Sequence, residues 1–134
     1  MRKRNLKLKE HGISCKRYNE LMWYCRQYPD WVSELNNMAV IKSQNVTGMP
    51  NSSGQTSNQT EELAIRRQEL SKKCELIEQT AIEADGDLYQ YIIKNVCYDK
   101  PVDYLITHGM PCSAPSFYDK RRYFFYLLDK NKKY

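Results

Sequence analysis

The chain has 134 residues, of which 28% are charged and 41% hydrophobic, and its formal net charge is +5 at pH 7. This length allows one small core or two small modules, and no run approaches the roughly 20 apolar residues of a membrane span. No apolar segment follows the basic N-terminus as it would in an export signal, and five cysteines without a Cys-x-x-Cys pair favour free thiols, so we expect a cytoplasmic protein.

Positive charge is concentrated at both ends of the sequence. Residues 1–20 carry seven Lys/Arg and two Asp/Glu, residues 21–115 carry eight and twelve, and residues 116–134 carry six and two. Localised positive charge on an arm and on a helix is typical of surfaces that bind polyanions. The alternative is a solvated surface with two solubilising termini.

The first unit, residues 1–41, is predicted to be a basic arm followed by helices. Residues 1–10 are expected to be a mobile arm that could touch phosphates. Ser14 is a good N-cap for a helix to about Gln27, and Pro29 suits the first turn of a continuation. The pattern therefore predicts a helical hairpin or a kinked helix with an aromatic-rich side.

Residues 42–60 differ sharply in composition from the rest of the chain. Ser, Thr, Asn, Gln, Gly and Pro supply 16 of these 19 residues, and Lys42 is the only charged one. Because such a composition cannot build a core, we expect a flexible polar linker that separates the N-terminal helices from residues 61–134.

A long helix is expected from an N-cap at Thr60 to about Asp85. Apolar residues, with some small and polar ones, follow a 4-3 spacing along it that favours either packing against the N-terminal helices or a homodimer through this helix. The seam positions are Leu63, Arg67, Leu70, Cys74, Ile77, Ala81, Ala84 and Leu88.

Three further helices are predicted at the C-terminal end. The first has an apolar face from Leu88 to Val96, and the second begins at Pro101 and ends at the C-cap glycine Gly109. The third is basic. The fold class is therefore expected to be all-α, with an N-terminal helical hairpin, a polar linker, a long helix and a C-terminal three-helix helix-turn-helix unit.

The last helix is predicted to run from Ser116 to Lys130. Ser116 would be its N-cap and Asp119 its capping-box carboxylate, while Pro115 would disfavour an earlier start. One stripe of this helix must be buried, and it consists of Phe117, Phe124 and Leu128, flanked by Phe125 and Leu127.

The other side of the last helix is the candidate DNA-binding surface. Arg122, with Tyr123 or Asp119, would face base edges in the major groove. The phosphates would be contacted by Lys120, Arg121, Lys130 and the tail residues Lys132 and Lys133. The alternative is an amphipathic helix with a solvated charged side. The predicted DNA-binding residues are Ser116, Tyr118, Asp119, Lys120, Arg121, Arg122, Tyr123 and Lys130.

Sequence motifs give no support for catalysis. There is no P-loop, dinucleotide fingerprint, Gly-x-Ser-x-Gly or His-Glu-x-x-His, so we expect neither an enzyme nor a cofactor. His108, Cys112 and Cys97 lack a credible fourth ligand, and a turn histidine with two buried or half-buried thiols is the better interpretation than a zinc site.

Several segments resemble one family of phage proteins. They are Ile13-Ser14 to Tyr18-x-x-Leu21, then Cys25-Arg26-Gln27-Tyr28-Pro29, Glu78-Gln79-Thr80-Ala81, and Phe117-Tyr118-x-x-Arg121-Arg122-x-Phe124-Phe125-x-Leu127-Leu128. The chain resembles small prophage-encoded proteins of Gram-positive bacteria that are related to transcriptional regulators of the RinA and ArpU kind.

The resemblance implies a DNA-binding helix-turn-helix similar to the promoter-reading domain of sigma factors. Double-stranded DNA would be the partner, with RNA polymerase and a second copy of the chain as further candidates and no membrane. Tyr118, Arg121 and Arg122 would be contacts. Two alternatives stay open: a phage packaging or assembly factor of the small-terminase kind, and a protein-interaction adaptor whose basic helix binds an acidic partner.

Overall fold

The protein is all-α over the part of the chain that the structure describes. The computed structural model describes residues 12–46 and 55–132, which form six helices and no strand. None of these helices combines the length and the hydropathy that crossing a bilayer requires. The helices are α1 (Cys15–Arg26), α2 (Tyr28–Val46), α3 (Gln55–Ala84), α4 (Tyr89–Val96), α5 (Val102–Thr107) and α6 (Ala114–Asn131).

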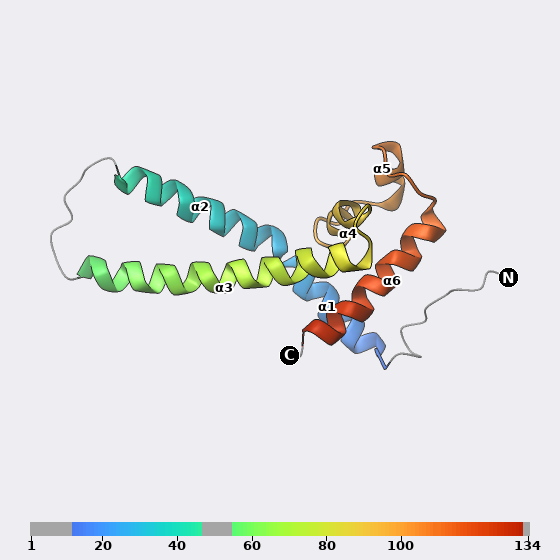
Figure 1. The fold of residues 1–134 in the computed structure, drawn as a ribbon, viewed down its shortest axis with the longest axis horizontal. Coiled ribbons are helices and arrows are strands. Elements are labelled where there is room, and N and C mark those ends of the chain that lie inside the picture. The colour runs from blue at the N-terminus through green and yellow to red at the C-terminus, as the bar shows by residue number, and fades with distance from the viewer. Residues whose placement is uncertain (1–11, 47–54, 133–134) are drawn as a thin grey trace.

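The N-terminal helices form a kinked helix rather than a hairpin. Ser14 caps α1 as predicted, since its Oγ accepts a hydrogen bond of 3.1 Å from the Arg17 amide. Only Gln27 separates α1 from α2, and the Trp31 amide donates to the Gln27 carbonyl at 3.1 Å, so helical hydrogen bonding resumes at once. The predicted hairpin of the N-terminal helices is therefore wrong. It is α2 that lies alongside α3 (Figure 1).

The helices extend further into the predicted linker than expected. α2 ends at Val46 and α3 begins at Gln55, whereas the predicted linker spanned residues 42–60. Once a helix is nucleated, adding one more residue costs little, so polar residues next to a long helix can join it. Residues 47–54 lie outside the described residues, and so does the predicted basic arm, residues 1–10.

The core is made where α3 meets the C-terminal helices. α6 crosses the second half of α3 and also packs against α1 and α4 (Figure 1). The predicted stripe of α6 is confirmed, because Phe117, Phe124, Phe125 and Leu128 are fully buried and Leu127 is partly buried. From α3 the core takes Leu70, Cys74, Ile77, Ala81 and Ala84, which are five of the predicted seam positions.

The start of α6 differs from the prediction. Its N-cap is Ser113, whose Oγ accepts a hydrogen bond of 3.5 Å from the Ser116 amide, and Pro115 lies within the first turn. Proline is favoured there because the first amides of a helix have no partner inside the helix. The assignment of Ser116 as N-cap, with Asp119 as capping-box residue, is therefore wrong.

Two arginines of α1 join this helix to distant parts of the chain. The Arg17 guanidinium donates to Asp129 Oδ1 at 2.7 Å and to the Lys132 carbonyl at 2.9 Å, and so holds the end of α6. The Arg26 guanidinium donates to the Val96 carbonyl at 2.7 Å and thereby caps the end of α4. α1 is thus attached to the body by polar contacts as well as by apolar packing.

All five cysteines are free thiols, and three of them lie in the core. Cys25 and Cys97 are in hydrogen-bonding contact, and this contact together with burial raises the pKa of Cys97. Burial raises the pKa of Cys74 to about 11. Cys74 and Cys97 are therefore neutral thiols at physiological pH and serve as small apolar core residues.

Candidate nucleic-acid interface

The outward side of α6 carries four of the predicted contact residues on one line. Ser116, Lys120, Tyr123 and Lys130 are all exposed, and their spacings of four, three and seven residues place them on one face of the helix. Because the opposite side of α6 is fixed in the core, this face is held rigidly. We call these four residues the outer line of α6.

The first cations of α6 are joined to neighbouring helices. Lys120 Nζ lies 3.6 Å from Asp85 Oδ2, at the end of α3. The Arg121 Nη1 donates to Asn95 Oδ1 of α4 at 3.0 Å, and its guanidinium lies 5.0 Å from the centre of the Tyr118 ring. These contacts link the first half of α6 to the end of α3 and to α4.

Arg122 does not point freely outward. Its side chain is only 16% exposed and forms an ion pair with Asp119, one turn earlier in α6. Its Nε is buried and makes no hydrogen bond within the described residues. Arg122 therefore neutralises Asp119 on this surface, which removes a negative charge that would repel phosphate.

The last turns of α6 combine aromatic rings with a lysine. The Tyr123 and Tyr126 rings are stacked with their centres 6.2 Å apart, and the Lys130 ammonium lies 4.5 Å from the centre of the Tyr126 ring. A hydrogen bond to Tyr126 raises the pKa of Lys130, so this lysine stays charged at physiological pH. This end of α6 therefore presents a cation beside two aromatic rings.

The two tail lysines predicted to contact phosphates are Lys132 and Lys133. The Lys132 ammonium lies 4.6 Å from the centre of the Tyr24 ring of α1, so this lysine is directed to the body. Lys133 lies outside the described residues.

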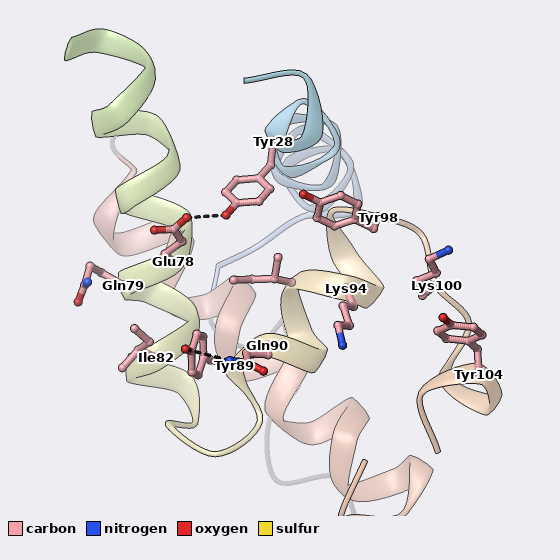
Figure 2. A pocket seen from close by; sticks show the side chains of 11 residues that line it. Tyr28, Glu78, Gln79, Ile82, Tyr89, Gln90, Lys94, Tyr98, Lys100 and Tyr104 are labelled. Carbon is pink, nitrogen blue, oxygen red and sulfur yellow. Dashed lines mark hydrogen bonds between the residues drawn. The ribbon is translucent and has the colours of Figure 1, made fainter. Parts of the chain in front are cut away.

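The sequence did not reveal which residues pair with Lys120 and Arg121. Asp85 and Asn95 belong to the end of α3 and to α4, and no local pattern connects them with α6. Likewise, no pattern singled out the groove beside α4, which Figure 2 shows lined by tyrosines and lysines. Its signal in the sequence was indirect, because Tyr89, Tyr98 and Tyr104 come close together along the chain but from α4, from the turn after it and from α5.

In the described residues, no three His, Cys, Asp or Glu side chains lie close enough together to hold a metal ion.

Comparisons of the chain with family models, with curated proteins and with solved structures give no match. The function must therefore be argued from the surfaces themselves.

Proposed function

We propose that the protein binds double-stranded DNA through the outer line of α6 and acts as a phage-type transcriptional regulator. The observation that carries the proposal is that α6 has one fully buried side and one exposed side with Lys120, Tyr123 and Lys130. Ten residues separate the two lysines, or about 15 Å along a helix, so they can reach phosphates at both edges of a base-reading segment.

In this proposal α4, α5 and α6 act as a helix-turn-helix unit with α6 in the major groove. Gly109, at φ +99°, ends α5, and residues 108–113 connect α5 to α6. This connection is longer than the usual turn of about three or four residues. The contact of Arg121 with Asn95 supports the unit, because it links α6 directly to α4.

The test is the salt dependence of duplex binding by the full chain, measured by fluorescence anisotropy between about 50 and 200 mM salt. Each phosphate contact contributes about −0.9 to the slope of log affinity against log salt. The double variant Lys120→Gln/Lys130→Gln should therefore lose about two units of slope. The control is Lys72→Gln, an exposed lysine of α3, which should keep the wild-type slope.

Two results would contradict the proposal: no binding of a duplex at the lowest salt, or an unchanged slope in the double variant. The mass of the free protein in solution separates regulation from packaging. A monomer or a dimer favours a regulator, while a ring of eight or more copies favours a small-terminase-like factor.

A further inference from the structure

A groove of about 650 Å³ lies beside α4, and no residue of α6 lines it. Its lining comes from α3 on one side, from the outward face of α4, and from residues 98–104 on the other side, with Tyr28 at one end (Figure 2). Binding sites for small ligands and peptide side chains have volumes of roughly 300 to 1,000 Å³. The groove is therefore large enough to hold a few residues of another chain.

The surface of this groove is apolar and aromatic. Ile82 of α3 and the rings of Tyr98 and Tyr104 are each at least 39% exposed, although they adjoin the core. Exposed tyrosines and aliphatic side chains gathered in a hollow are typical of protein-binding surfaces, where tyrosine is enriched.

The charge of the groove is positive. Lys94 and Lys100 line it and are exposed, and each ammonium is positioned beside a tyrosine ring, at 5.5 Å from the centre of Tyr91 and 5.2 Å from that of Tyr104. The one carboxylate in the lining, Glu78, accepts a hydrogen bond from the Tyr28 hydroxyl. Burial raises the pKa of Tyr28 and Tyr98, so both tyrosines are neutral at physiological pH.

The surroundings of the groove disfavour a nucleic acid as its occupant. Exposed carboxylates lie within one or two positions of lining residues in the sequence: Glu83 directly after Ile82, Asp87 two residues before Tyr89, and Asp103 directly before Tyr104. A phosphate backbone carries a charge on every unit and would be repelled there, whereas one or two carboxylates can reach the two lysines alone.

We propose that this groove binds a short segment of a partner protein in which one or two carboxylates flank a large apolar side chain. The apolar side chain contacts Ile82 and the tyrosine rings, and the carboxylates pair with Lys94 and Lys100. This site is separate from the outer line of α6, so the protein would hold DNA and a protein partner at the same time.

The experiment uses the immobilised full chain and a library of random dodecapeptides displayed on phage. Enriched peptides should carry Asp or Glu beside Leu, Phe or Trp. Synthesised peptides of this kind should bind Lys94→Glu/Lys100→Glu at least about tenfold more weakly than the wild type. Lys72→Glu, at an exposed position outside the groove, should bind like the wild type.

A second measurement locates the peptide without relying on variants. Addition of the peptide to ¹⁵N-labelled protein should shift the amide resonances of Ile82, Gln90 and Lys94, and leave those of Ser116 and Tyr123 in place. Three results would overturn the proposal: no enriched peptide, peptides that bind the charge-reversed variant equally well, or a dodecamer of thymidylate that occupies the groove in their place.

Discussion

The two halves of α3 have the same kind of helical seam but very different surroundings. Leu70 is fully buried, whereas Leu63, seven residues earlier on the same face, is 50% exposed. Residues 60–69 are all exposed, and α2 is the helix that pairs with this half, while the second half meets α6 and α4 as well (Figure 1). The seam is thus buried only where a further helix packs on the α2–α3 pair, and the spacing of the seam residues does not show where that happens.

This difference divides the molecule into an arm, formed by the later turns of α2 and the first half of α3, and a body, formed by the second half of α3 together with α1, α4, α5, α6 and the start of α2. Local opening requires little free energy where few apolar contacts are broken. We therefore expect amide protons of residues 60–66 to exchange with solvent faster than those of residues 74–84. The stability of the fold resides in the body.

The largest effect should come from removing a central ring of the body. Phe124 is fully buried between α6 and its neighbours, so Phe124→Ala should lower the free energy of unfolding by about 3 to 5 kcal/mol. Urea denaturation followed by circular dichroism measures this loss. The control Tyr123→Ala removes the adjacent exposed ring and should cost about 0.5 kcal/mol. A loss below 1 kcal/mol for Phe124→Ala would mean that the stripe is not buried.

A matched pair on α3 tests the division between arm and body directly. Leu70→Ala should cost about 2 to 5 kcal/mol, whereas Leu63→Ala should cost less than about 1 kcal/mol, because only the first creates a cavity. Both are measured by urea denaturation. Equal losses would show that a further partner covers Leu63, as in a dimer through the arm.

A smaller effect is expected at the polar attachment of α1 to α6. Arg17→Ala removes hydrogen bonds to Asp129 and to the Lys132 carbonyl from a partly buried position, and should cost about 1 to 2 kcal/mol. The adjacent variant Lys16→Ala, at an exposed position, should leave stability unchanged in the same denaturation experiment. If both variants behave alike, the contacts of Arg17 do not hold α1 on the body.

The smallest effect should occur at the ion pair of the arm, where Arg66 Nε donates to Glu34 Oε2 at 2.9 Å. This hydrogen bond holds the pKa of Glu34 below its usual value. Its contribution is therefore present above the glutamate pKa of the unfolded chain, and is lost as the pH falls through the folded pKa.

Carbon-13 NMR titration of the Glu34 carboxyl group tests this pair. In Arg66→Ala the pKa of Glu34 should rise toward the ordinary glutamate value, while in Arg67→Ala it should keep the wild-type value. An unchanged pKa in Arg66→Ala would mean that α2 and α3 are not in contact at this point.

The local features of the fold were predictable, whereas the pairing of distant elements was not. Ser14 as a cap, Gly109 as the end of α5 and the buried stripe of α6 all follow from residue preferences within a few positions. The start of α6 was misassigned because two serines, Ser113 and Ser116, both precede helix-compatible residues, and Pro115 fits either arrangement.

In the candidate interface, too, the local features were predictable and the contacts with distant residues were not. The exposed positions of Lys120, Tyr123 and Lys130 follow from helical periodicity alone. The inward turn of Arg122 toward Asp119 and the contact of Arg121 with Asn95 depend on packing, and no periodic pattern contains this information. Whether these side chains contact DNA stays a prediction.

The central place of α6 also sets the order of events during synthesis. Arg17 meets Asp129 across 112 positions of the chain, and Leu21 and Ile77 lie in the same core as α6. On the ribosome these residues emerge long before α6, while α2 and α3 can pair early. We therefore expect the body to complete its core only after α6 has left the exit tunnel, and its apolar faces to be open to chaperones and proteases until then.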